Sequence, residues 1–280
     1  MSQQFDPELH RQMGVEADVV LRVGMLLMGA GTSGYRVLRG MKRSARALGF
    51  DHLDATVGLT QITCTFHRGE YFRTVIARQH SPAVDASRIE ALEDLTHNRL
   101  YAGITAQELA AMLDVIEFGV KKRWSGLVLS FAAAIACAAF AYLNFFPLEA
   151  VGLVALAAFA GQFVRYTVLH RHVHQIGGVI AGGATASIVF FLLTAFFGAI
   201  GSVDPSELSS GVVAAVLFLI PGFPLFSALI DIARFDLDAG IVRLGYAFTV
   251  IFTATFTVSM VSWLTQLTPD PVSYTHLRAH

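Results

Sequence analysis

The feature that most constrains this chain is the series of long apolar runs that follows residue 123. An α-helix rises about 1.5 Å per residue, so roughly 20 apolar residues cross a hydrocarbon core about 30 Å thick. Hydrophobic residues make up 54% of the 280 residues and charged residues 15%, whereas soluble domains average about 25% charged. The sequence therefore predicts an α-helical polytopic membrane domain over residues 121–268. Its expected spans lie at about 124–142, 148–169, 176–200, 211–232 and 241–264.

The charged residues crowd instead into residues 1–120, which we expect to form a small α+β domain. Thr105 and Glu108 have the spacing of a capping box, in which each side chain accepts a hydrogen bond from the other residue's backbone. The apolar alternation of residues 56–66 slips near Thr60 and Gln61, which we interpret as a β-bulge. The expected elements are helices at residues 7–28, 35–48, 85–101 and 105–117, and strands at residues 56–66 and 71–78.

Residues 29–34 read Gly-Ala-Gly-Thr-Ser-Gly, which matches the G-x-G-x-x-G pattern of dinucleotide-binding loops. That fingerprint requires a strand before it and a βαβ unit around it, whereas the preceding residues have the apolar period of a helix. We interpret the pattern as a flexible break between two helices, and we expect no cofactor.

The expected helix at residues 35–48 has an apolar stripe on one side and basic residues over much of the rest. Two interpretations are open, because such a helix can lie on an anionic membrane surface or be the solvated face of a small domain. The net charge of −1 and the lack of a basic tract with interleaved aromatics do not indicate nucleic-acid binding. The basic residues are Arg36, Arg39, Lys42, Arg43 and Arg46.

The loops between the expected spans differ in their lysine and arginine content. The loops around residues 144–149 and 201–210 contain neither, whereas the opposite ends of the spans are basic. Because basic loops stay in the cytoplasm, we place residues 1–120 in the cytoplasm and the end of the fifth span outside. The basic residues counted are Lys121, Lys122, Arg123, Arg165, Arg171, Arg234 and Arg243.

The fourth expected span is interrupted near its middle by Pro221, Gly222 and Pro224. Proline lacks a backbone donor and moves the preceding residue out of the helical region, so we expect Ile220 and Phe223 to leave the helix. A second half-helix should then begin at Phe223 and Pro224. Opened backbone at this depth persists only against protein or a water-filled cavity, and such a break points to a transporter's binding site. We predict a substrate-binding site at Pro221, Gly222, Phe223 and Pro224.

Two further features lie close to this break in the sequence. Thr249, Thr253 and Thr257 share one face of the fifth span, and their hydroxyls either line a polar path or bond to carbonyls of their own helix. In the first case Thr249 and Thr253 contribute to the substrate site. Asp231 lies near the inner interface, where a charge costs little, and is either a coupling or gating residue or simply solvated.

The third expected span contains Gly178 and Gly182 at G-x-x-x-G spacing, which predicts close helix packing within this chain or against a partner. His170 and His174 could share a helix face, but no carboxylate or cysteine lies nearby in the sequence. We therefore expect a cationic loop there and no metal site. The two cysteines fall in different domains, so no disulfide is expected.

Together these features resemble the threonine/serine exporter family, and more narrowly its N-terminal domain. The resemblance rests on the basic helix ending at residues 43–49, the hairpin, the helical pair, and five spans with Ile-Pro-Gly-Phe-Pro at residues 220–224 followed by Asp231. It covers about residues 15–264. It implies a bacterial inner-membrane protein whose five-span half is accompanied by a second, smaller hydrophobic half. That half is either fused behind the first or supplied by a separate membrane protein, as in paired dicarboxylate (succinate) exporters.

No second hydrophobic half follows residue 268 in this sequence. Residues 271–280 read unlike the preceding span, and we interpret them as a non-native tail on a truncated reading frame. We therefore expect the bilayer-embedded chain to work with a smaller hydrophobic subunit or a missing C-terminal half. A homo-oligomer is also open.

The first functional hypothesis is a secondary exporter, or exporter subunit, of small carboxylate-bearing metabolites such as threonine, serine or succinate. The alternative is a membrane-tethered regulatory or scaffold protein that acts through its cytoplasmic domain. A membrane-embedded enzyme is a third hypothesis, but the sequence shows no nucleophile or metal constellation at membrane depth.

Overall fold

The computed structural model describes residues 7–79, 84–120, 124–171, 173–200 and 211–265. The chain packs as two compact units. The first unit comprises Met1–Arg123 and Gly222–Tyr246, and the second comprises Trp124–Pro221 and Ala247–His280. The tail at residues 271–280 and the basic residues 121–123 lie outside the described residues.

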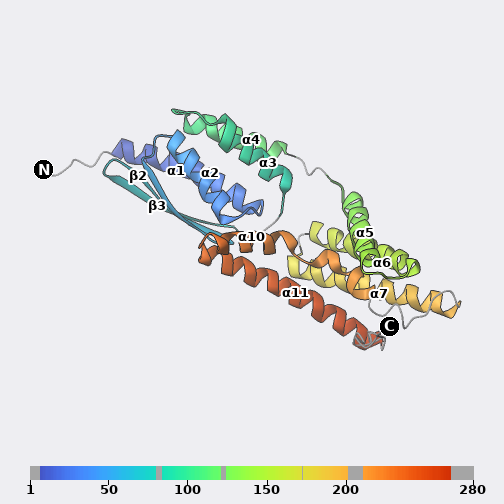
Figure 1. The fold of residues 1–280 in the computed structure, drawn as a ribbon. Helices are drawn as coiled ribbons and strands as arrows, with labels where there is room; N and C mark the ends of the chain where they lie inside the picture. The colour runs from blue at the N-terminus through green and yellow to red at the C-terminus, as the bar shows by residue number, and fades with distance from the viewer. Residues whose placement is uncertain (1–6, 80–83, 121–123, 172, 201–210, 266–280) are drawn as a thin grey trace, which may run out of the picture. The chain divides into compact units, whose positions relative to one another are not determined.

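The first unit contains an α+β module with a three-stranded antiparallel sheet in the order β1-β2-β3. In Figure 1, α1 and α2 lie along the sheet, with α3 and α4 on their other side. The core between these layers is apolar, and its largest fully buried side chains include Met13, Leu27, Met41, Ile62, Phe66, Leu92 and Leu109. The elements are α1 Pro7–Gly29, α2 Gly34–Ala47, β1 His52–Val57, β2 Gln61–Arg68, β3 Tyr71–Arg78, α3 Ala86–Asp94, the π-helix Leu95–Arg99 and α4 Ala106–Gly119.

The predicted bulge near Thr60 is wrong, because those residues form a hairpin turn between two strands. β1 ends at Val57, the Gly58 N–H donates to the Gln61 carbonyl at 2.8 Å, and β2 runs back beside β1. A tight turn changes the phase of inward-facing residues by one position, as a bulge does, so the alternation alone could not separate the two. The strand β1 was missed for this reason.

The capping box at the start of α4 is confirmed. The Thr105 hydroxyl accepts from the Glu108 N–H at 3.2 Å, and a Glu108 carboxylate oxygen accepts from the Thr105 N–H at 2.9 Å. The helix expected at residues 85–101 is divided instead. Asp85 caps α3, which ends at Asp94, and one π-helical turn follows.

The first unit also includes α10 (Gly222–Ala233) and the first ten residues of α11 (Leu237–Thr265). They contact the turn into α2 through the buried charged side chains of Asp231 and Arg243. The preceding α1 is helical up to Gly29, so the G-x-G-x-x-G segment is an interhelical break as expected.

The second unit is helical and apolar. Its elements are α5 Gly126–Leu143, α6 Leu148–His170, α7 Gln175–Ala199, α9 Gly211–Ala215, the 3₁₀-helix η2 Leu217–Leu219 and the rest of α11. Four helices in the described part of the chain, α5, α6, α7 and α11, are long and apolar enough to cross a membrane. The fourth expected span is not a single helix. Its residues are divided among three successive elements, α9, η2 and α10. The fold is therefore a mostly helical membrane architecture with a small sheet in its N-terminal region.

The G-x-x-x-G prediction is confirmed as packing within the chain. A Cβ placed on Gly161 of α6 would lie 2.7 Å from the Gly182 carbonyl oxygen on α7 and 2.7 Å from the Ala186 Cβ. A Cβ on Gly178 would lie 2.8 Å from Leu169. The glycines thus let the backbones of α6 and α7 approach closely.

Candidate functional site

The break in the fourth span lies at the predicted place. α9 ends at Ala215, one 3₁₀ turn follows, and Ile220 is extended with φ −62° and ψ 124°. This is the conformation that a residue before proline favours. The 3₁₀ bonds run from the N–H of Leu219 to the Val216 carbonyl and from the N–H of Ile220 to the Leu217 carbonyl.

The expectation for Phe223 is wrong, because α10 begins at Gly222 and Phe223 is helical. Pro224 then sits in the first turn of α10, where the helix leaves its N–H groups without intrahelical partners. A proline there removes no helical hydrogen bond. Gly222 is open, since a Cβ placed on it would meet no heavy atom within 4 Å. Ile220 and Phe223 are 48% and 44% exposed.

Side chains of neighbouring helices contact the opened backbone of η2. The Arg165 Nη1 of α6 donates to the Phe218 carbonyl at 3.3 Å. The Cys137 thiol of α5 lies at the backbone amides of Leu217 and Phe218. These contacts meet the requirement that broken backbone at membrane depth be covered by protein. Sequence reasoning assigned Arg165 to a basic loop, whereas the structure places it on α6, five residues before the helix ends.

The threonine face of α11 bonds along its own helix. Thr253 Oγ1 donates to the Thr249 carbonyl and Thr257 Oγ1 donates to the Thr253 carbonyl, each at 2.8 Å. This is the second of the two interpretations offered above, and each hydroxyl oxygen can still accept a hydrogen bond. Phe252 and Phe256 beside them are 73% and 60% exposed, as residues facing lipid would be.

The predicted site residues belong to different units. Pro221, Thr249 and Thr253 are in the second unit, whereas Gly222, Phe223, Pro224 and Asp231 are in the first. Within the second unit, a groove of about 450 Å³ lies between the α9–η2 segment and the C-terminal half of α11. Its lining is mostly apolar, and the polar side chains in it are Thr255, Ser259 and Ser262.

Asp231 is fully buried, so the interpretation that it is solvated is wrong. Its Oδ2 accepts from the N–H of Gly34, the first residue of α2, at 3.2 Å. Ser33, in the N-cap position, makes no side-chain capping bond, so the carboxylate of a distant residue caps α2 instead. A negative charge at this end is also favoured by the helix dipole.

Arg243 of α11 pairs with Asp231, a contact that the sequence did not predict. The Arg243 Nε lies 3.3 Å from Asp231 Oδ2, and its Nη1 donates to the Thr32 carbonyl at 2.6 Å. Arg243 is 4% exposed. Its position in the sequence had suggested only a basic residue between two spans. One sequence signal could have predicted this pair. Asp231 lies near the end of one apolar helix and Arg243 near the start of the next, so a hairpin between the helices brings the opposite charges together.

Arg234 adds a further contact at this junction. Its guanidinium lies 3.8 Å from the centroid of the Tyr35 ring, the distance of a cation–π contact. Asp231, Arg234 and Arg243 therefore connect the α10–α11 hairpin to residues 32–35, the turn into α2.

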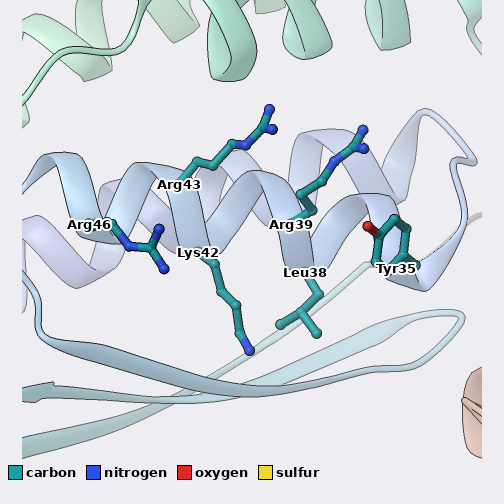
Figure 2. Close-up of a pocket in the computed structure, with 6 residues that line it drawn as sticks. All are labelled: Tyr35, Leu38, Arg39, Lys42, Arg43 and Arg46. Atoms are coloured by element: carbon teal, nitrogen blue, oxygen red, sulfur yellow. The ribbon is translucent and has the colours of Figure 1, made fainter.

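The basic helix α2 carries a surface pocket of about 280 Å³. Figure 2 shows that Arg39 and Arg43 point to one side of the helix while Lys42 points to the other. Arg39 pairs with Glu93 at 2.8 Å. Arg39, Lys42 and Arg43 therefore do not converge on one point and form no site for a single anion. The lining residues are Tyr35, Leu38, Arg39, Lys42, Arg43 and Arg46.

The histidine segment does not form one helical face. α6 ends at His170, and His174 is the N-cap of α7, where its Nδ1 accepts from the Ile176 N–H at 3.3 Å. His172 lies outside the described residues. No group of three or more His, Cys, Asp or Glu side chains in the described ranges is arranged to hold a metal ion.

Comparisons with known proteins agree with the architecture. Residues 18–265 match the family described as "Putative threonine/serine exporter". The chain is 22% identical over 255 residues to the Escherichia coli (strain K12) protein named "Probable succinate transporter subunit YjjP", covering 88% of this chain and 92% of that protein. It is 23% identical over 208 residues to the Klebsiella aerogenes protein of the same name, covering 73% and 76%. No solved structure matches the chain. Since the family match extends over most of its length, the chain belongs to the threonine/serine exporter family.

Proposed function

We propose that this protein is an inner-membrane secondary exporter, or one subunit of such an exporter, for small carboxylate-bearing metabolites. Threonine, serine and a dicarboxylate such as succinate all carry the required group. Family membership supports the transport class, and the names of the two relatives support a carboxylate substrate.

The observation that carries the proposal is the helix break before Gly222. α10 is a 12-residue helix whose first turn follows an extended residue and a proline. A helix N-terminus offers unpaired N–H groups and a partial positive charge, worth about 0.3–1 kcal/mol for an anion at exposed sites. We assign substrate binding to Pro221, Gly222, Phe223 and Pro224, where a carboxylate could accept from these N–H groups.

Thr249 and Thr253 are the proposed polar lining on α11. Their hydroxyl oxygens can accept a hydrogen bond from a substrate ammonium or hydroxyl group even while the Thr253 proton is donated along the helix. We expect these hydroxyls to contribute less to carboxylate binding than the N-terminus of α10, because they supply no positive charge.

Asp231 is the proposed coupling or gating residue. It lies nine residues beyond the start of α10, and its carboxylate connects that helix to the turn before α2 and to Arg243. Protonation of this carboxylate would weaken the ion pair, so a proton could change how α10 is held.

The proposed partner is a second, smaller hydrophobic membrane subunit or a missing C-terminal half. The two relatives are named as transporter subunits, which supports a working unit larger than one chain. We propose that residues 1–120 face the cytoplasm, on the positive-inside argument given above.

The experiment is uptake of labelled succinate, threonine or serine by inverted membrane vesicles that contain this chain and a candidate partner subunit. We expect uptake of at least one substrate with both proteins present. The double variant Pro221→Ala with Gly222→Leu should reduce the flux at least tenfold, because it favours a continuous helix through the break.

The matched control is Gly152→Leu on α6. A Cβ at either Gly152 or Gly222 meets no heavy atom within 4 Å, so neither leucine begins with a steric clash. Unchanged flux in the double variant would contradict the site at the break. A full-length protein that transports none of the substrates but binds a specific soluble protein would favour the regulatory alternative.

A further inference from the structure

We infer that Arg165, together with Gln162 on the same face of α6, binds the carboxylate of the transported substrate. The inference rests on the proposed function and deepens it, because it names the cation that the substrate meets beside the broken helix. All the contacts that carry it lie within the second unit.

Arg165 lies inside an apolar helix. α6 runs from Leu148 to His170 and is one of the helices long and apolar enough to span a bilayer. Arg165 is five residues from the C-terminal end of α6, where a charge costs less than the roughly 2.5–3.5 kcal/mol of a helix centre, and ionisable residues in spans commonly mark substrate pathways. The position of Arg165 therefore calls for a physical reason.

The structural alternative is that Arg165 only extends to the membrane interface, as arginines near helix ends do. Its observed contact is different, since the guanidinium donates to the Phe218 carbonyl in η2. That carbonyl is two residues before Ile220, the extended residue at the break. The guanidinium is thus held against the broken segment itself.

Three elements meet at this point. A Cβ on Gly161 would lie 2.7 Å from the Gly182 carbonyl of α7 and 2.9 Å from the Phe218 ring of η2. A Cβ on Gly182 would lie 2.9 Å from the Arg165 Cβ. Because α6 and α7 cross closely here, the Cβ of Arg165 is held in place. It lies one helical turn beyond Gly161, the residue of α6 that contacts η2.

Gln162 supplies a second polar group on this face of the helix. It precedes Arg165 by three residues, a spacing that places both side chains on one side of an α-helix. Its Oε1 is buried and has no hydrogen-bond partner within the described residues. A buried amide oxygen without a partner is costly, so it points to a donor that arrives with a ligand.

The chemistry of the pair fits a small carboxylate. A guanidinium carries five N–H donors in a planar fork, which can bind a carboxylate with two parallel hydrogen bonds. The Gln162 oxygen can accept from an ammonium or hydroxyl group two or three atoms away from that carboxylate. Lysine would keep the charge of residue 165 but lose the fork.

The test measures concentration-dependent uptake in the inverted vesicles described above, with the partner subunit present. We expect Arg165→Gln to raise the KM for the carboxylate about 10- to 100-fold, the range for loss of a hydrogen bond to a charged group. Arg165→Lys should raise the KM by a smaller factor. It replaces Arg165→Gln as the test variant if the glutamine variant does not fold. Gln162→Leu should also raise the KM for threonine or serine, because succinate has no ammonium or hydroxyl group that could donate to the Gln162 oxygen.

The matched control is Arg171→Gln, which removes the same charge from the exposed residue just past the end of α6 and should leave the KM unchanged. A second readout tells whether Arg165 binds the substrate carboxylate or only supports the Phe218 carbonyl. Inhibition of uptake by the unlabelled carboxylate is compared with inhibition by its neutral amide, and Arg165→Gln should abolish the preference for the carboxylate.

The outcomes separate the two proposals. A wild-type complex that transports no carboxylate overturns the proposed function and this inference with it. A wild-type complex that transports, with an Arg165→Gln variant whose KM and carboxylate preference are unchanged, overturns the inference alone. A lower maximal rate at unchanged KM and preference would make Arg165 a support for the Phe218 carbonyl, which also overturns it.

Discussion

Asp231 and Arg243 form the most consequential pair at the scale of single residues. Each is almost completely buried, at 0% and 4% exposed, and each also bonds to the backbone between α1 and α2. A buried pair of this kind is weak evidence for net stability, but removing one member leaves the other charge uncompensated. The pair therefore fixes where, within the first unit, the α10–α11 hairpin contacts the turn into α2.

We expect Asp231→Asn to destabilise the protein by about 3 kcal/mol, the lower end of the range for a broken buried pair. The lower end applies because Asp236 is close by, with its Oδ2 3.1 Å from the Cβ position of Gly34. Thermal unfolding of the purified full-length protein should show a midpoint lowered by roughly 5–10 °C.

The control for this substitution is Asp238→Asn, which changes an exposed carboxylate seven residues further along and should leave the midpoint unchanged. The double variant Asp231→Asn with Arg243→Gln should recover part of the loss, since no unpaired charge remains buried. Equal midpoints for Asp231→Asn and the wild type would show that the pair does not hold the hairpin.

At the scale of elements, the crossing of α6 and α7 depends on two glycines that leave no room for a side chain. The atoms nearest to a Cβ on Gly161 are the Ala186 Cβ and a backbone oxygen of Gly182, and neither can rotate away. The helices would have to separate. Because η2 also packs on Gly161, the separation would move the broken segment.

We expect Gly161→Ala to lower the midpoint of thermal unfolding, even though alanine favours an isolated helix over glycine by about 1 kcal/mol. Gly152→Ala on the same helix provides the comparison. Its Cβ would meet nothing within 4 Å, so this variant should be as stable as the wild type or slightly more stable. A Gly161→Ala protein with an unchanged midpoint would mean that α6 and α7 are not closely crossed.

At the scale of the whole molecule, the orientation in the membrane decides which side the α+β module occupies. The test uses single accessible cysteines, and the native protein is a suitable background for it. Cys64 and Cys137 are each 1% exposed, and burial raises the pKa of the Cys64 thiol to about 12. A thiol with so high a pKa is almost entirely protonated at neutral pH and unreactive toward maleimides.

We expect Glu70→Cys, in the turn between β2 and β3, to react with a membrane-impermeant maleimide in inverted vesicles but not in intact cells. Asn144→Cys, in the exposed loop between α5 and α6, should show the opposite behaviour. Gel-shift or mass-spectrometric detection of the adduct gives the answer. Labelling of both positions from the same side would contradict the positive-inside assignment.

Much of this protein follows from its sequence because the signals are local. Apolar runs predict spanning helices, a threonine three residues before a glutamate predicts a cap, and a proline after Ile220 predicts a break. Each depends on a residue and its immediate chain neighbours, and each is found in the structure. The hairpin near Thr60 was misread because a turn and a bulge leave the same local pattern.

Tertiary structure decided what the charged side chains do. Asp231 and Gly34 are 197 positions apart in the chain, and the distance between Arg165 and Phe218 is 53 positions. No periodicity or motif joins such residues, because helix packing alone brings them together. The sequence by itself determined the helical membrane class and the position of the break. Packing determined that Asp231 is buried at the start of α2, and that Arg165 meets the opened backbone of η2.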